Sequence, residues 1–430
     1  MALSNWSGEH RFAPRHVHRP RGRAAIAAAV RAAAARGATL RPMGSGHSWT
    51  ALCASDEELL LLDQHDRALM FDYAARTATV EGGMRLYDLN RALDAHGLAM
   101  PNLGSIDRQT IAGVLSTATH GTGARLGNLS TFITELELVD GRGDLRRCSR
   151  SRDAELFAAA RCGLGALGVI CSVTLACQPA FRLHSVEEVT SIDWVLDALD
   201  ELVDDNDHFK LWWIPRSDRC LIYRQNRTGQ PVARSRLRKL VDQRLVRGPI
   251  YGALLSAAAR SRRAAAAVTD LIWQATPRRV QYVDASYRVL SFPVEVRHHE
   301  CEYAIDRRHA AAALRRIRAH VERSDLEVNM PIEVRFVRAD DIWLSPAYRR
   351  DSCYICPTMA LARDYSAYFS QVEALLADFD ARPHWGKTHG VPPARLAELY
   401  PRFADFLAVR ERLDPDGVFL SPYMRRLLGL

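Results

Sequence analysis

The stretch that decides the fold of this 430-residue chain is Arg41-Pro42-Met43-Gly44-Ser45-Gly46-His47-Ser48, which follows an expected strand at 39–43. Two glycines within three residues let the backbone turn tightly and bring its N–H groups close to an anion. The histidine at the end of the turn is then held towards whatever the loop binds. Gly-x-Gly turns are common, and a histidine after one is more often a hydrogen-bonded loop residue, so the rest of the chain must decide between the two interpretations.

Helices and strands are expected to alternate around this loop up to about residue 180. Pro20 opens an alanine-rich helix that Gly37 ends, and Asp153 caps a helix that runs to residue 161. Gly141-Arg142-Gly143-Asp144 is a hairpin signature between strands at 132–140 and 145–149. Hydrophobic spacing predicts further strands at 59–63, 77–81 and 165–177 and a helix at 84–96.

The second half has a different pattern. Strands are expected at 289–296, 302–305 and 331–337, with helices near 307–321 and 364–379. These elements predict an antiparallel sheet covered by helices, an α+β unit that begins after Pro179. A chain of 430 residues is too long for one core, so two domains are expected.

Composition favours a globular protein, with 48% hydrophobic and 25% charged residues. No apolar run approaches the roughly 20 residues needed to span a bilayer, and residues 1–10 lack a signal-peptide core, so a cytoplasmic location is expected. Nine scattered cysteines fit a reducing compartment. Cys353 and Cys356 lie in an expected strand, where an offset of three puts them on opposite faces, so we interpret them as packing residues and expect no metal.

Basic clusters at 234–239 and 260–263 contribute to a net charge of +8. Such clusters suit nucleic acid or an anionic membrane, but no aromatic residues are interleaved with them and no nucleic-acid motif is present. We interpret them as solvated faces of helices rich in alanine and arginine. No nucleic-acid partner is expected, membrane association is possible but not expected, and the oligomeric state is left open.

Two glycine-rich stretches accompany the opening loop. Ser116-Thr117-Ala118-Thr119-His120-Gly121-Thr122-Gly123 combines small and hydroxyl residues, which suit close approach to phosphates or a polar ring edge as well as a tightly packed turn. Residues 163–170 are glycine-rich, but they lack the preceding strand and following helix of a dinucleotide fingerprint. A Rossmann domain of the nicotinamide type is therefore disfavoured.

Two later segments carry charge or aromatic groups. Alternation in Ile332-Glu333-Val334-Arg335-Phe336 puts Glu333 and Arg335 on one strand face, which points to water as a surface salt bridge or into a site. Pro383-His384-Trp385-Gly386-Lys387-Thr388-His389-Gly390 is too rich in functional groups to be a mere linker.

Four motifs now stand in one order: 44–48, Ala-Thr-His-Gly-Thr-Gly at 118–123, Glu-Val-Arg at 333–335 and His-Trp-Gly-Lys at 384–387. Through them the chain resembles the vanillyl-alcohol-oxidase-type flavoproteins, and among these the sugar-1,4-lactone oxidases (gulonolactone and arabinonolactone oxidases) and the related alditol oxidases. The resemblance spans the chain from Asn5-Trp6-Ser7-Gly8 to 414–420. It implies an α+β fold of two domains: a PCMH-type FAD-binding domain at 1–180 and a substrate or cap domain at 181–382, with a segment at 383–430 that returns to complete the active site.

The resemblance also implies the site. FAD would be bound through its pyrophosphate by the opening loop, and His47 would be bonded to the flavin 8α-methyl group. The implied cofactor-binding residues are Arg41, Met43, Gly44, Ser45, Gly46, His47, Ser48, Gly104, Ser105, Thr110, Gly113, Thr117, Ala118, Thr119, His120, Val169 and Ile170. Glu333, Arg335 and Lys387 are the implied catalytic residues, which also bind substrate. Ser105 and Thr358 are further substrate contacts, although Cys356-Pro357-Thr358-Met359 departs from the usual pattern.

The expected reaction is oxidation of a sugar-1,4-lactone hydroxyl by hydride transfer to flavin N5, with O₂ reoxidising the flavin to give H₂O₂. Gly104 leaves space beside the flavin and favours an oxidase. Open alternatives are an alditol oxidase acting on xylitol or sorbitol and a lactone dehydrogenase that uses another acceptor. A non-catalytic binding protein is a third alternative, disfavoured by the intact set of Glu333, Arg335 and Lys387. Which residue takes the alcohol proton is left open.

Overall fold

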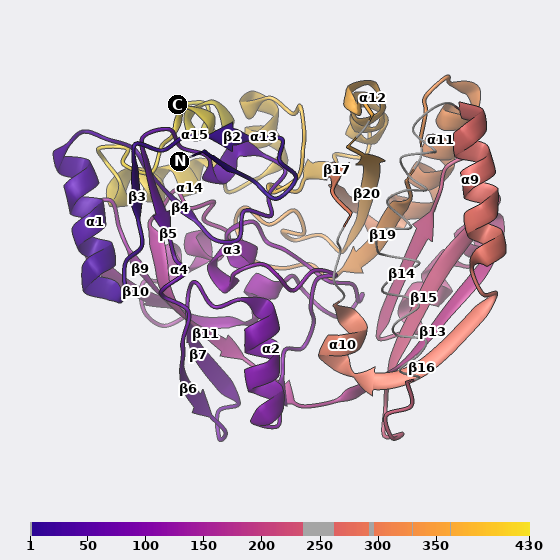
Figure 1. Cartoon of the computed structure of the whole chain (residues 1–430), viewed down its shortest axis with the longest axis horizontal. Coiled ribbons are helices and arrows are strands. Elements are labelled where there is room, and N and C mark those ends of the chain that lie inside the picture. The colour runs from indigo at the N-terminus through magenta and orange to yellow at the C-terminus, as the bar shows by residue number, and fades with distance from the viewer. Residues whose placement is uncertain (1, 235–261, 292–295, 329, 362) are drawn as a thin grey trace.

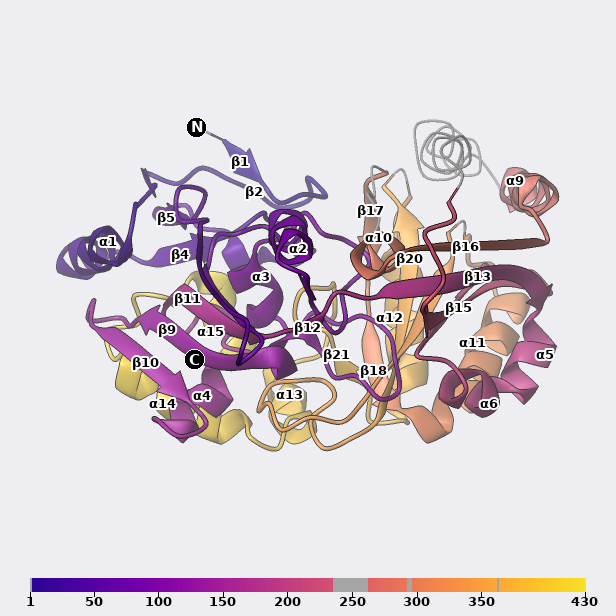
Figure 2. The ribbon, with the colours of Figure 1, turned by 90° about the horizontal axis from the view of Figure 1, so that it is seen from below.

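Two halves lie side by side in the computed structural model, which describes residues 2–234, 262–291, 296–328, 330–361 and 363–430 (Figure 1). Both chain ends lie on the same half, and the C-terminus directly follows helix α15 (Pro422–Leu428) (Figure 1 and Figure 2). Helices and strands occur throughout both halves, which confirms the predicted α+β class. No helix within the described residues is long and apolar enough to cross a membrane.

The first half contains two larger sheets, besides the strand pairs of β1 (Leu3–Ser4) with β2 (Arg11–Phe12) and of β8 (Leu98–Ala99) with β12 (Gln178–Pro179). An antiparallel sheet has the order β10 (Leu145–Ser149), β9 (Ile133–Val139), β11 (Val169–Ala176), β7 (Thr77–Glu81) and β6 (Ala68–Asp72). A smaller parallel sheet has the order β3 (His16–His18), β5 (Glu58–Leu61) and β4 (Leu40–Met43). The glycine loop at 44–48 leaves the end of β4, as predicted.

Helices pack around these sheets. They are α1 (Arg23–Ala35), α2 (Leu86–Ala95), α3 (Ile111–Ser116), α4 (Ala154–Ala160), and from the C-terminal segment α13 (Pro393–Leu399), α14 (Phe403–Leu413) and α15. Phe406 and Phe419 are fully buried in the same apolar core as Leu60, Leu138 and Phe157. The end of the chain therefore completes the core that its beginning starts.

The second half is built on a nine-stranded sheet in which every described pairing is antiparallel. Its order is β16 (Arg279–Ala285), β13 (Arg182–Ser191), β15 (Arg219–Thr228), β14 (His208–Trp213), β19 (Ile332–Val337), β20 (Ser352–Ala360), β18 (Tyr303–Asp306) and β21 (Arg382–Pro383), with β17 (His298–Glu300) on β20. Figure 2 shows helices α5 (Ile192–Asp197), α6 (Leu199–Asp204), α11 (Ala310–Arg323) and α12 (Ser366–Ala377) below this sheet.

The alternation of β19 explains why the two sheet faces differ. Ile332, Val334 and Phe336 are buried in the apolar core under the helices. Glu333 and Arg335 lie on the opposite face, as predicted, and their side chains are only 14% and 9% exposed, so this face is not an open surface. The sheet thus directs its charged side chains towards the first half of the molecule.

Most predicted elements are confirmed within a few residues. Asp153 caps α4 by accepting a hydrogen bond from the Leu156 N–H. Cys353 and Cys356 lie in β20 with side chains on opposite faces, as predicted, and both are buried. The basic clusters at 234–239 and 260–263 fall almost entirely outside the described residues.

One predicted strand is wrong. The start of the expected strand at 289–296 belongs to helix α10 (Ser286–Leu290). The adjacent Val289 and Leu290 of this helix are both buried in the apolar core of the first half, which we call the first core. Packing of this short helix against the core prevailed over the strand propensity of its valine. Strands β13 and β15 escaped prediction because charged residues such as Glu187 and Arg224 interrupt their apolar alternation.

Candidate active site

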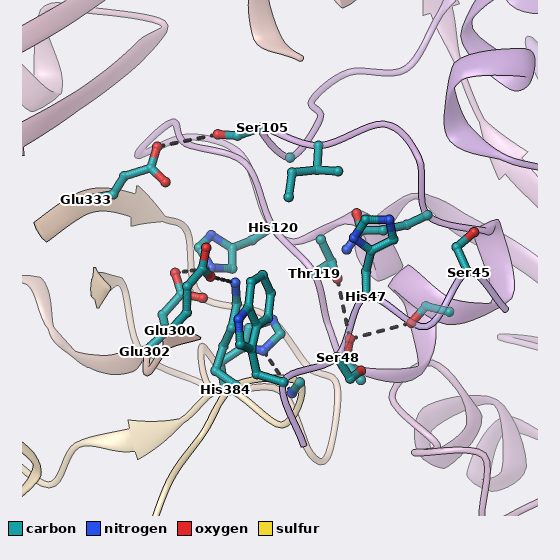
Figure 3. A pocket seen from close by; sticks show the side chains of 18 of the residues that line it. Ser45, His47, Ser48, Ser105, Thr119, His120, Glu300, Glu302, Glu333 and His384 are labelled. Carbon is teal, nitrogen blue, oxygen red and sulfur yellow. Dashed lines mark hydrogen bonds and ion pairs between the residues drawn. The ribbon is translucent and has the colours of Figure 1, made fainter. Parts of the chain in front are cut away.

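A cavity of about 340 Å³ lies where the two halves meet. The glycine loop at 44–48, the loop at Gly104–Ser105, strand β19 and the loop with Lys387 all contribute to its lining. Figure 3 shows His47 and Ser45 on one side of the cavity and Glu333, Glu302, Glu300 and His384 across from them. Residues far apart in the sequence are therefore brought together.

Most of the predicted site residues line this cavity. They are Arg41, Met43, Gly44, Ser45, Gly46, His47, Ser48, Gly104, Ser105, Thr110, Gly113, Thr117, Thr119, His120, Ile170, Glu333, Arg335, Thr358 and Lys387. Ala118 and Val169 do not, and both are fully buried in the first core. Because β11 alternates, Val169 points into the core while Ile170 points to the cavity.

The glycines of the opening loop are required by close packing. A Cβ at Gly44 would lie 2.0 Å from Thr110 Oγ1. Gly46 has a φ of +68°, in the left-handed region that favours glycine, and a Cβ there would lie 2.7 Å from Met43 Cε. The loop therefore presents backbone rather than side chains to the cavity at these two positions.

Arg41 supports this loop from behind. Its buried guanidinium donates hydrogen bonds to the carbonyls of Leu52, Leu164, Gly165 and Phe419. Burial lowers the pKa of Arg41 to about 10. Since four carbonyls engage the guanidinium, its role is to hold the loop against β11 and the C-terminal segment.

His47 is held as a neutral imidazole. Its ring stacks on Trp6 with centroids 5.3 Å apart and an interplanar angle of 25°. Burial and, secondarily, the charge of Lys387 lower the pKa of His47 to about 4. Among the described residues, His47 Nδ1 and Ser45 Oγ are buried without a hydrogen-bond partner. Buried polar atoms without partners are costly, so both atoms fit a bound polar group.

These features fit FAD. The glycine loop allows backbone N–H groups to approach a pyrophosphate, and Ser45 and His47 have unused polar atoms beside it. Thr117 and Thr119 place two hydroxyls 3.4 Å apart on the same wall. We call this wall, formed by residues 41–48 and 104–120, the cofactor wall.

Glu333 and Arg335 form an ion pair on the facing wall. Arg335 NH2 lies 3.3 Å from Glu333 Oε2, while Lys210 Nζ lies 3.0 Å from Glu333 Oε1. Burial would raise the pKa of Glu333, but the charges of Arg335 and Lys210 lower it well below its ordinary value. Glu333 is therefore a carboxylate at neutral pH.

A second buried network lies behind this pair. Arg335 NH2 is 3.1 Å from Glu302 Oε1, and His120 Nε2 is 3.2 Å from the same oxygen. Burial opposes ionisation of Glu302, yet Arg335 and His120 lower its pKa to about 2. His120, Glu302 and His384 could together ligate a metal, but the guanidinium of Arg335 already supplies the positive charge that Glu302 faces.

Lys387 belongs to a third network. Its ammonium pairs with Glu300 Oε2 and lies 3.9 Å from the centre of a Trp49 ring. His298 Nε2 is 2.6 Å from Glu300 Oε1. Burial alone lowers the pKa of Lys387 to about 7, and the Glu300 carboxylate opposes this by favouring the ammonium.

The sequence interpretation missed Lys210, Glu300 and Glu302. Together with Glu333, Arg335 and Lys387 they form what we call the charged wall, in which three carboxylates face three cations. One signal could have found Lys210: only three of the 58 basic residues are lysines, at 210, 239 and 387. Two of these three lie in the charged wall.

Comparisons with known proteins agree with this geometry. Residues 173–427 match the D-arabinono-1,4-lactone oxidase family model, and residues 14–149 match the FAD binding domain model. The chain is 39% identical over 427 residues to an L-gulono-1,4-lactone dehydrogenase of Mycobacterium tuberculosis, covering 99% of both chains. It is 31% identical over 435 residues to an L-gulonolactone oxidase of Mus musculus, covering 99% of this chain and 98% of the relative.

A solved structure shares the fold. Cholesterol oxidase from B. sterolicum superimposes with a TM-score of 0.81 at 18% identity, covering 99% of this chain and 96% of the other. At this identity the likeness concerns the fold alone. It confirms, with the FAD binding domain match, the predicted fold class.

Proposed function

Because this chain belongs to the D-arabinono-1,4-lactone oxidase family, we propose that it oxidises a hydroxyl group of a sugar-1,4-lactone with FAD and passes the electrons to O₂, forming H₂O₂. The observation that carries the proposal is the charged wall facing the cofactor wall across one cavity. FAD, when bound, supplies the acceptor for the hydride at flavin N5.

The charge balance of the cavity supports a neutral substrate. Glu333, Glu302 and Glu300 face Arg335, Lys210 and Lys387, so the charged wall offers hydrogen bonds without an unpaired cation. An anionic sugar acid or phosphate would need a surplus of positive charge in this buried site. A lactone ring has hydroxyls but no ionised carboxylate, which suits the balance.

The residues of the charged wall have distinct proposed roles. Glu333, held ionised between two cations, accepts a hydrogen bond from the substrate hydroxyl and orients the carbon that is oxidised. Arg335 and Lys387 stabilise negative charge that develops on the hydroxyl oxygen as the proton leaves. Thr358 lines the cavity, although its hydroxyl donates to the Pro331 carbonyl at 2.6 Å, so it offers substrate an acceptor.

Relatives named as oxidases support O₂ as the acceptor. Gly104 adds no support, because an added Cβ would lie 3.3 Å from the His120 carbonyl oxygen, a tight contact, although the φ of Gly104 is not in the left-handed region. Close packing against residues 119–120 is therefore a sufficient reason for this glycine. A relative named as a dehydrogenase favours, in contrast, a second candidate with another acceptor.

The test is anaerobic flavin bleaching with aldonolactones, their open-chain acids and alditols, followed by admission of air. We expect lactones to bleach the flavin, the acids to leave it oxidised, and air to restore the yellow colour with release of H₂O₂. Bleaching by xylitol or sorbitol alone would favour an alditol oxidase, and a flavin that stays bleached in air would favour a dehydrogenase. A colourless protein that takes up no FAD would favour a non-catalytic binding protein.

Covalent attachment through His47 is a further part of the proposal. A neutral imidazole with an unpartnered nitrogen, held flat against Trp6, suits a nucleophile for the flavin 8α-methyl group. Acid-precipitated protein should keep yellow flavin in the pellet, and His47→Ala should release it to the supernatant. His16→Ala, on the exposed strand β3, is the matched control. Flavin released from the unmodified protein would contradict the covalent bond.

A further inference from the structure

Lys210 is a buried cation that joins three segments of the site. It lies on β14, where it is paired in register with Arg335 of β19. Its Nζ lies 3.0 Å from Glu333 Oε1 and 3.4 Å from Ser105 Oγ, and Ser105 Oγ lies 3.4 Å from the same Glu333 oxygen. The three side chains thus close a triangle between β14, β19 and the loop at 104–110 of the cofactor wall.

The surroundings of Lys210 fit a fixed point charge. Its side chain is 6% exposed, and Nζ lies 4.8 Å from the Tyr223 ring centre and 5.2 Å from a Trp212 ring centre. Both distances allow cation–π attraction, which favours the charged ammonium in a buried place. An arginine fork binds both oxygens of a carboxylate, whereas an ammonium binds one.

The two cations therefore contact different oxygens of the Glu333 carboxylate. Lys210 and Ser105 contact Oε1, while Arg335 contacts Oε2 and also reaches Glu302. The plane of the carboxylate is therefore set from both sides. Removing Lys210 would leave Glu333 with the Ser105 contact at Oε1 and the Trp212 hydrogen bond. Arg335 would then be the adjacent cation, so the carboxylate would be drawn towards Arg335.

We propose, resting on the function proposed above, that Lys210 is a positioning residue for alcohol oxidation, which keeps Glu333 ionised and turned so that it receives the substrate hydroxyl. Lys210 acts through Glu333 and Ser105 rather than on the substrate. The same contact ties the sheet of the second half to the cofactor wall.

The pH dependence of the reaction follows from the charges around Glu333. The titratable or charged groups that act on it are Lys210 from β14, Arg335 from β19, Cys356 from β20, His298 from β17, and Glu302 beyond Arg335. Burial raises the pKa of Glu333, and Arg335 and Lys210 lower it. Loss of the Lys210 charge should raise this pKa, because an opposite charge at contact distance favours the ionised carboxylate.

The test compares Lys210→Met with Lys210→Arg in anaerobic flavin reduction by an aldonolactone over a range of pH. In Lys210→Met we expect the reduction rate to fall about 100-fold and the acid limb of its pH profile to move to higher pH. In Lys210→Arg the acid limb should return to the pH that it has in the unmodified protein, because arginine restores the positive charge. Arg219→Met, an exposed position at the start of β15, is the control for loss of a basic residue from this sheet.

A double-mutant cycle separates positioning from a structural role. In a Glu333→Gln background, Lys210→Met should lower the rate of flavin reduction little further, because the carboxylate that Lys210 positions is already absent. Equal loss in both backgrounds, or an unshifted acid limb in Lys210→Met, would overturn the proposal.

A measurement that needs no substrate can test the role of Lys210 even if the proposed lactone oxidation is wrong. The protonation of Glu333 can be followed by infrared difference spectroscopy of the FAD-bound protein against Glu333→Gln, with no substrate present. Lys210→Met should move this titration to higher pH even if no lactone bleaches the flavin. An unmoved titration would overturn the role of Lys210, whereas a moved titration without lactone bleaching would count against the lactone substrate alone. Should Lys210→Met not fold, Lys210→Gln and the Lys210→Met, Glu333→Gln double variant give the same comparisons.

Discussion

The two walls of the cavity achieve binding in opposite ways. The cofactor wall uses backbone and small hydroxyl side chains, and its buried Arg41 donates hydrogen bonds to four backbone carbonyls. The charged wall instead buries three carboxylates against three cations. One wall is sensitive to added volume and the other to lost charge, because a tight backbone contact has no room and a buried ion has no solvent.

Removing a cation from the charged wall should have the largest effect on flavin reduction by substrate. In Arg335→Ala, Glu333 and Glu302 lose the cation that they share, so we expect flavin reduction by substrate to fall about 1,000-fold, a loss typical of removing a key electrostatic group. FAD should stay bound, because Arg335 is not on the cofactor wall. Stopped-flow absorbance measures both.

The matched control for that variant is Arg338→Ala, an exposed arginine just beyond the same strand. It should reduce flavin at the normal rate. Normal reduction in Arg335→Ala would show that the charged face of β19 is only structural, and the contrast between the walls would fail.

A substitution in the cofactor wall should have an intermediate effect, on FAD affinity rather than on the rate of flavin reduction. Gly44→Ala places a Cβ against Thr110 Oγ1, a contact of 2.0 Å that forces the loop to move. Overpacking of this kind costs about 1–3 kcal/mol, so we expect the Kd for FAD to rise about 5- to 150-fold, measured by fluorescence titration of the apoprotein in a His47→Ala background, where FAD binds without a covalent bond.

The control for this substitution is Gly229→Ala, where an added Cβ meets nothing within 4 Å and φ is not in the left-handed region. The reduction rate per bound flavin should be nearly unchanged in Gly44→Ala. A lost rate with unchanged FAD affinity would mean that the two walls are not separate in function.

The smallest expected effect concerns the protonation of Lys387 in the charged wall. Lys387 stabilises developing negative charge only while protonated, and its pKa is lowered from 10.5 by burial. Because the ammonium is lost as pH rises, flavin reduction should fall about tenfold in an alkaline limb between about pH 7 and 10.5. Stopped-flow reduction across this range measures the limb.

Glu300→Gln should move this alkaline limb to lower pH, because the carboxylate favours the protonated lysine. Glu398→Gln, on the exposed side of α13, is the control. A limb that stays in place in Glu300→Gln would show that Glu300 does not set the charge of Lys387.

Local patterns marked the segments of the cofactor wall, and the family resemblance assigned these segments to FAD. Glycine spacing at 44–46 and the hydroxyl run at 116–123 are readable because their chemistry lies within a few consecutive residues. Ala118 and Val169 were predicted by extending a motif to every member, but both are buried in the apolar core and do not line the cavity.

Alternation along 332–336 determined the strand face that carries Glu333 and Arg335, whereas the class of fold and the cofactor loop came from the family resemblance that four motifs carry together. Only the tertiary structure decided the partners: Lys210 for Glu333, Glu302 for Arg335 and Glu300 for Lys387. These pairs join segments between 33 and 123 residues apart, and strand register and loop placement bring them together. Burial then gives the pairs their strength, since a charge removed from water depends on its neighbour to remain ionised.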